Sequence, residues 1–205
     1  MTIELGTTDI NKVLLGSTEI NKVMLGSTEV YSAGITEVNN PNTNIRATGG
    51  GSWGNGFEVV ETLPANTEGY IEFTATNDHT GGDNYAMFGF SRESDASVTG
   101  YGGIRYAIYV RMGALRVFES GGSVYAETAF TNGDTVQVHR SVTGVITYKK
   151  NGITFYTSLK PADTVEMKGD GCFLGANDRV LDIVLERGNG PFNPTYDNKF
   201  NVTEY

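Results

Sequence analysis

The chain has 205 residues, of which 39% are hydrophobic and 19% charged, as in an ordinary globular protein. Its net charge of −9 argues against nucleic-acid binding and against binding to anionic membrane surfaces, because both need a basic face. The 27 glycines, together with many tyrosines and phenylalanines, favour turns and strands over helices.

The cysteine content and the N-terminal sequence give information about the cellular compartment in which the protein folds. The single cysteine, Cys172, excludes an internal disulfide, so we expect a fold that does not depend on an oxidising compartment. The N-terminus lacks the basic segment and apolar run of a signal peptide. No stretch of the sequence approaches the length of a membrane span. We therefore expect no membrane insertion.

Residues 3–30 read IELGTTDINKVLLGSTEINKVMLGSTEV, a ten-residue phrase in three copies. Gly-Ser-Thr suits a turn and the flanking Val, Ile and Leu suit strands, so each copy predicts a short strand and a turn. Three such strands bury too little apolar surface to stand alone. Residues 1–31 are therefore expected either to form a collar shared by several chains or to be a self-contained appendage. The repeated apolar positions are the candidate assembly residues: Leu5, Leu15, Leu25, Ile10, Ile20 and Val30.

Residues 32–56 are rich in Asn and Gly and are expected to be a linker. From residue 57 to 188, short alternating runs are separated by Gly, Asn and Asp, which is typical of an antiparallel β-sandwich. In residues 70–75, for example, Ile71 and Phe73 share one face with Ala75. In residues 181–185, Leu181 shares a face with Ile183 and Leu185. The sequence thus predicts an all-β chain.

The sharpest local signal is VITYKKNGITFYTS, residues 145–158. Asn-Gly readily adopts the positive φ angles of a type I′ turn, which predicts a two-residue hairpin loop at Asn151-Gly152. That loop would pair Lys150 with Ile153 and Tyr148 with Phe155.

The last segment, residues 189–205, has two prolines, many asparagines and four aromatic residues, which is not typical of strands. It predicts an arm whose aromatic side chains pack on the chain's own surface or on a neighbouring subunit.

The candidate ligand-binding residues lie in predicted loops. The loop of residues 77–84 gathers carboxylates, amides and an imidazole, and it predicts either a plain polar connection or a glycan or calcium contact. Trp53 and Tyr101 each lie among glycines and are candidates for stacking against a sugar or for anchoring a loop. The candidate ligand-binding residues are Asp78, His79, Asp83, Asn84, Tyr101 and Trp53.

Catalytic and metal signals are weak. His139 falls on the polar face of its predicted strand, and Cys172 is expected to be a buried thiol. Glu58 and Glu61 are three residues apart and so lie on opposite faces of a strand, unlike the paired carboxylates of glycosidases. No zinc or EF-hand spacing occurs in the sequence. We therefore expect no enzymatic activity, no metal and no cofactor.

Two resemblances follow from these motifs. The segments GYIEF (69–73), YAMFGFS (85–91), NGDTVQVHR (132–140) and VITYKKNGITFYTS resemble the concanavalin A-like jelly roll, close to its SPRY and laminin-G-like branches. The LGSTE repeats resemble those at the N-termini of bacteriophage virion proteins, notably tail-fibre-like proteins.

Together these resemblances imply a phage structural protein, made in the bacterial cytoplasm and located in the virion. The expected role is a tail-fibre or spike-like adhesin whose lectin-like head binds a host surface glycan or protein. The alternative is a capsid decoration or head-fibre protein with no ligand. The expected partners are other copies of the chain, as a trimer, and other virion proteins, with no nucleic acid.

Overall fold

The computed structural model describes residues 14–15, 18–19, 22–25, 28–32, 44–77, 83–92, 94–95, 100–188, 191–192, 194–200 and 202–205. The described residues form strands and turns, so the all-β prediction is confirmed. No helix in this part of the chain is long and apolar enough to cross a membrane. The chain divides into two compact units, residues 1–37 and 38–205, which are treated separately below.

The first unit contains two antiparallel hairpins. In one, β1 (Leu14–Leu15) pairs with β2 (Thr18–Glu19), and Leu15 lies opposite Thr18. In the other, β3 (Lys22–Leu25) pairs with β4 (Thr28–Ser32), and Leu25 lies opposite Thr28. The two repeats therefore share one register, with two residues between the paired strands. Leu5, Ile10 and Ile20 lie outside the described residues.

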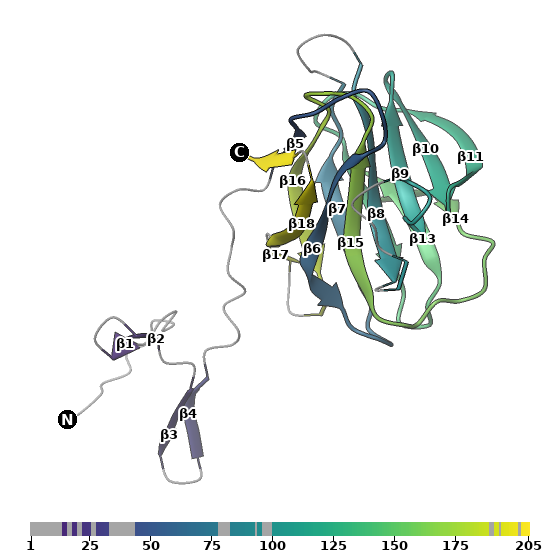
Figure 1. The fold of residues 1–205 in the computed structure, drawn as a ribbon. Helices are drawn as coiled ribbons and strands as arrows, with labels where there is room; N and C mark the ends of the chain where they lie inside the picture. Colours follow the sequence, from purple (N-terminus) through teal and green to yellow (C-terminus); the bar gives the residue numbers. More distant parts are fainter. Residues whose placement is uncertain are drawn as a thin grey trace. The chain divides into compact units, whose positions relative to one another are not determined.

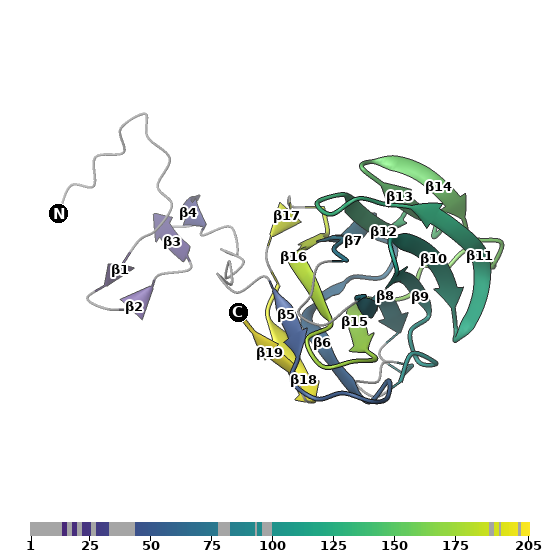
Figure 2. The ribbon, with the colours of Figure 1, turned by 90° about the horizontal axis from the view of Figure 1, so that it is seen from above.

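The second unit is a sandwich of two antiparallel sheets (Figures 1 and 2). The seven-stranded sheet has the order β11-β10-β9-β8-β15-β6-β18. Its strands are β6 (Asn55–Leu63), β8 (Tyr85–Arg92), β9 (Tyr106–Arg111), β10 (Ala114–Glu119), β11 (Gly122–Ala129), β15 (Met167–Phe173) and β18 (Tyr196–Phe200).

The eight-stranded sheet has the order β14-β13-β12-β7-β16-β5-β19, with β17 paired to β16. Its strands are β5 (Ile45–Ala47), β7 (Gly69–Thr74), β12 (Thr135–Arg140), β13 (Ile146–Lys150), β14 (Ile153–Thr157), β16 (Arg179–Glu186), β17 (Pro191–Phe192) and β19 (Val202–Glu204). The chain crosses repeatedly between the sheets, so neighbouring strands such as β6 and β15 are distant in sequence. This is the predicted jelly-roll arrangement.

The alternation of side chains along the strands builds the core. Ile71 and Phe73 of β7, with Phe88 of β8, are at most 1% exposed, and Phe88 packs against both Phe57 and Phe73. At one side of the sandwich the edge strands β11 and β14 come close, because Tyr125 packs on Phe155 and Tyr156 (Figure 2). The inward faces thus match the period-two pattern of the sequence.

The hairpin prediction is confirmed at its turn and wrong at Tyr148, two pairs further along. Asn151 and Gly152 have φ angles of 50° and 77°, as a type I′ turn requires, and Lys150 lies opposite Ile153. A bulge then shifts the register, so Tyr148 faces Tyr156 and not Phe155. Ile153, directly after the turn, is 74% exposed.

A second bulge changes β16. Asp182 has a φ of 50°, and the register with β7 shifts between Leu181 and Val184. Val180 and Ile183 are therefore buried, while Leu181 is only half-buried, contrary to the strict alternation expected.

The sandwich also includes more of the chain than residues 57–188. Ile45 and Ala47 of β5 are fully buried in the core, although residues 32–56 were expected to be a linker. The C-terminal segment adds β18 to one sheet and β19 to the other, although its composition did not predict strands. These short strands lie at or near sheet edges, where proline and asparagine are tolerated.

Candidate ligand-binding surface

Five aromatic side chains gather on the face of the seven-stranded sheet that points away from the core. Phe88 and Ile108 belong to the core, whereas their neighbours Met87 and Tyr109 belong to a second cluster, so the two sets lie on opposite faces. This second cluster has Met87, Ile104, Ala107 and Cys172 buried at its base. We call its aromatic members the aromatic surface: Trp53, Tyr85, Tyr101, Tyr109 and Phe118.

The rings of the aromatic surface meet edge to face. The Trp53 centroid is 5.3 Å from that of Tyr101 and 5.4 Å from that of Tyr109. The Phe118 centroid is 6.1 Å from that of Tyr101 and 5.5 Å from that of Tyr109. Tyr109 is 7% exposed, while Trp53, Tyr101 and Phe118 are partly buried. The geometry is the favoured one for aromatic pairs and leaves part of each outer ring accessible.

A glycine-rich loop positions Trp53. The Gly51 amide donates to the Leu174 carbonyl at 3.2 Å. A Cβ at Gly50 would lie 2.8 Å from the Ala176 amide nitrogen, so only glycine permits this approach. The glycines before Trp53 therefore fasten the loop to the end of β15, and they do not act as a flexible linker.

A tight turn positions Tyr101. The Ile104 amide donates to the Tyr101 carbonyl at 3.2 Å, and the Ile104 side chain is fully buried beneath the surface. The turn lies close to the β10–β11 connection, since a Cβ at Gly121 would lie 3.2 Å from the Gly102 Cα. Tyr101 is thereby held beside Trp53 and Phe118.

Charged groups flank the rings. Burial raises the pKa of the Tyr109 hydroxyl, while the positive charges of Arg111 and Arg116 lower it and so oppose this shift. Arg116 also forms an ion pair with the exposed Glu127 of the edge strand. The aromatic surface therefore has guanidinium groups beside it, which donate hydrogen bonds in planar pairs.

Of the six predicted ligand-binding residues, the structure brings Trp53 and Tyr101 together. Asp78 and His79 lie outside the described residues. Asp83 accepts a hydrogen bond from Asn77 Nδ2 at 3.2 Å. Asn84 is 1% exposed, and its amide donates to the Thr76 and Arg179 carbonyls at 3.0 and 2.9 Å. Asn84 therefore joins two loops and presents no free amide to a ligand.

The other residues singled out in the sequence have ordinary environments. His139 lies 3.2 Å from a Glu68 carboxylate oxygen and stacks on Tyr70, and burial lowers its pKa. It is less solvated than expected, with 15% of its side chain exposed. Cys172 is fully buried, and burial raises its pKa. Among the described residues, no three His, Cys, Asp or Glu side chains are grouped to hold a metal ion.

One carboxylate pair was not predicted, because it forms across strands. Glu58 of β6 lies opposite Asp170 of β15. Lys168 Nζ is 2.7 Å from a Glu58 oxygen, and Ser91 Oγ donates to Asp170 at 2.7 Å. The pair resembles a hydrolytic dyad in type, but Glu58 is 5% exposed and Asp170 is fully buried. A polymer does not reach these oxygens in this conformation, so the pair is best interpreted as part of the sheet's internal polar network.

Comparisons with known proteins show similarity of fold and nothing more specific. No family model matches the chain, and no curated protein matches it. Similar solved structures include the SPRY domain of human HERC1, with 15% identity and a TM-score of 0.46 over 73% of this chain and 91% of that one. A heptameric SAP-like pentraxin from Limulus polyphemus has 13% identity and a TM-score of 0.49 over 78% and 93%. Sheep galectin-11 has 14% identity and a TM-score of 0.35 over 58% and 94%. At these values the structures carry no statement about ligand or activity.

Proposed function

We propose that the chain is a virion adhesin whose sandwich binds a host surface glycan through the aromatic surface. The observation that carries the proposal is the meeting of Trp53 and Tyr101, two loop residues distant in sequence, over the outer face of one sheet. Aromatic rings with polar groups beside them suit sugars, because sugar rings have apolar faces and hydroxyl edges. A host surface protein is the other candidate ligand.

The repeats support an assembled protein. Isolated two-stranded hairpins are marginal in water, so β1–β2 and β3–β4 gain stability from further chains or from another protein. Several heads on one assembly would raise a weak single-site affinity through avidity. The virion location rests on the resemblance of the LGSTE repeats to phage N-termini.

The proposed role is binding without cleavage. Purified protein is expected to leave the chain length of a bound polysaccharide unchanged, because the cross-strand pair of Glu58 and Asp170 is buried. A fall in polysaccharide length on incubation with the pure protein would instead indicate a hydrolase.

The test is competition for phage adsorption to host cells. Purified wild-type protein should block adsorption, and Trp53→Ala and Tyr101→Ala should block at least about tenfold less well at equal concentration. Tyr205→Ala is the matched control, since Tyr205 is an exposed aromatic residue of the last strand region, outside the aromatic surface. Tight binding to virions with no blocking of adsorption would contradict the adhesin function and would support a capsid decoration or head-fibre protein.

A further inference from the structure

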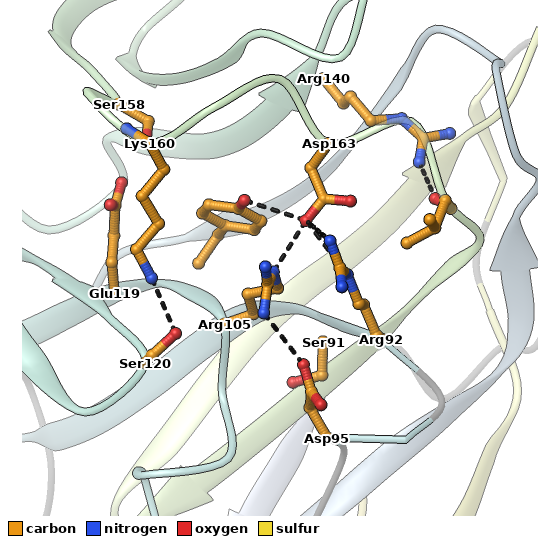
Figure 3. A network of polar contacts seen from close by, with 12 residues as sticks. Ser91, Arg92, Asp95, Arg105, Glu119, Ser120, Arg140, Ser158, Lys160 and Asp163 are labelled. Atoms are coloured by element: carbon orange, nitrogen blue, oxygen red, sulfur yellow. Dashed lines mark hydrogen bonds and ion pairs between the residues drawn. The ribbon is translucent and has the colours of Figure 1, made fainter.

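Two arginines converge on one buried carboxylate at the end of the sandwich (Figure 3). Arg92 ends β8, Arg105 immediately precedes β9, and Asp163 lies between β14 and β15. Asp163 Oδ2 accepts hydrogen bonds from Arg92 Nη2 at 3.0 Å, from Arg105 Nε at 2.7 Å and from the Tyr106 hydroxyl at 3.0 Å. One carboxylate thus holds two guanidinium groups in fixed positions.

The carboxylate lies beneath the guanidinium groups. The Asp163 side chain is 1% exposed, whereas those of Arg92 and Arg105 are 36% and 25% exposed. Arg92 donates to Asp163 from Nε and Nη2, and Arg105 donates from Nε to Asp163 and from Nη1 to Asp95. Of the five N–H bonds of each guanidinium, those on Arg92 Nη1 and Arg105 Nη2 make no hydrogen bond to another described residue. The two guanidinium groups are therefore held in fixed orientations while part of each side chain is exposed.

Lys160 adds a third cation. Its Nζ donates to Ser120 Oγ at 2.7 Å and lies 5.7 Å from the centroid of the Tyr106 ring (Figure 3). Burial lowers the pKa of Lys160, Glu119 opposes that shift, and the charge of Arg105 adds to it. The three cations lie among the carboxylates of Asp95, Glu119 and Asp163, so an anion would be held here by oriented N–H donors and not by a net positive charge.

Arg92, Arg105 and Lys160, here called the cationic site, lie next to the aromatic surface along two segments of the chain. The turn closed by the Tyr101–Ile104 hydrogen bond has Tyr101 at its start and Arg105 directly after it. Strand β10 carries Phe118 of the aromatic surface, and Ser120 follows two residues later, in the turn after the strand. The Ser120 amide also donates to the Ile104 and Arg105 carbonyls at 3.2 and 3.1 Å. The backbone of Arg105 therefore adjoins Ile104 and Tyr101 of the second cluster.

We propose that Arg92, Arg105 and Lys160 bind the anionic group of an acidic glycan whose uncharged rings lie on the aromatic surface. This inference rests on the proposed function and names its ligand class. The anionic group is a carboxylate or a phosphate, because both present two or more oxygens to the outward guanidinium N–H groups.

The test uses the full chain on an array of bacterial surface polysaccharides, each printed in native, carboxyl-reduced and dephosphorylated form. Binding to native acidic polysaccharides is expected, with a fall of about tenfold or more when the anionic group is removed. Loss on carboxyl reduction assigns a carboxylate, and loss on dephosphorylation assigns a phosphate. Because the change is made on the glycan, the result does not depend on a variant folding.

A protein variant gives the second measurement. Lys160→Gln should weaken binding to the native acidic polysaccharide several-fold, while Lys149→Gln, which removes a half-buried cation from β13 in the other sheet, should leave it unchanged. Equal affinity for native and neutralised polysaccharides, with Trp53→Ala still abolishing binding, overturns the acidic-glycan inference and leaves the adhesin standing. Absence of binding to every polysaccharide overturns both.

Discussion

Trp53 and Tyr101 come from two separate glycine-rich loops and meet edge to face with ring centroids 5.3 Å apart. Each ring also contacts a strand residue, Tyr109 for Trp53 and Phe118 for Tyr101. The contact joins two loops into one surface over the seven-stranded sheet, and it is the centre of the proposed binding site.

Trp53→Ala should cost less stability than a core substitution. Trp53 is partly buried and packs on the second cluster, whereas Phe88 is fully buried between the sheets. We expect about 1–2 kcal/mol for Trp53→Ala and about 3–5 kcal/mol for Phe88→Ala, measured by urea unfolding. A cost for Trp53→Ala equal to that of Phe88→Ala would indicate that Trp53 serves the fold and not a ligand.

Asp163→Asn should destabilise the fold by about 1–3 kcal/mol at neutral pH, because Arg92 and Arg105 lose the negative charge that they share. Asp95→Asn is the control. Its carboxylate is 35% exposed and forms an ion pair with Arg105, so about 0–1 kcal/mol is expected. Urea unfolding measures the loss of unfolding free energy in each variant. Equal losses would contradict the interpretation that Asp163 holds both guanidinium groups.

The same carboxylate gives a pH dependence. Burial alone would raise the pKa of Asp163, but hydrogen bonds from Arg92, Arg105 and Tyr106 outweigh it and lower the pKa below its ordinary value of 3.8. Ionised Asp163 therefore stabilises the fold above about pH 4, and this contribution is lost as the pH falls through the lowered pKa. Melting temperatures from pH 7 to pH 2 should fall less steeply at the acid end for Asp163→Asn than for wild type. Parallel curves would contradict the assignment.

Gly144→Ala should destabilise more than Gly152→Ala. Both glycines have positive φ angles, 82° and 77°, so both substitutions strain the backbone by about 1 kcal/mol. A Cβ at Gly144 would also lie 2.7 Å from the Asp163 amide nitrogen, whereas a Cβ at Gly152 would meet nothing within 4 Å. The difference in unfolding free energy should be about 1–3 kcal/mol. If the two costs are equal, the segment carrying Asp163 is not held by this contact.

Deletion of residues 1–31 should leave the sandwich folded, since the described core lies wholly in residues 45–196. Self-association should be lost, because the repeats are the proposed assembly device. Sedimentation velocity of the full and shortened chains measures this directly. An unchanged oligomer would move the assembly interface to the sandwich.

Local chemistry explains what the sequence could predict. The Asn151-Gly152 turn was predicted because two adjacent residues determine its backbone angles. The bulges in β14 and at Asp182 were missed, because an inserted residue keeps the apolar composition and changes only the register. Trp53 and Tyr101 were singled out one at a time, while their contact depends on which strands are neighbours.

The Asp163 cluster shows the limit of sequence alone more clearly. Arg92, Arg105 and Asp163 belong to three segments, and no spacing in the sequence relates them. The same holds for Glu58 and Asp170, which meet only because β6 and β15 pair. In a sandwich with long crossovers, polar sites of this kind appear once the strand order is known.

Trp53 is the only tryptophan of the chain, so its fluorescence reports on the aromatic surface alone. The most direct test of the central claim is to titrate the wild-type protein with a host surface polysaccharide that it binds, while recording tryptophan emission and, in parallel, binding by calorimetry. Our account predicts a saturable change in emission that follows the calorimetric isotherm. Calorimetric binding with unchanged Trp53 emission would contradict it and place the ligand elsewhere on the sandwich.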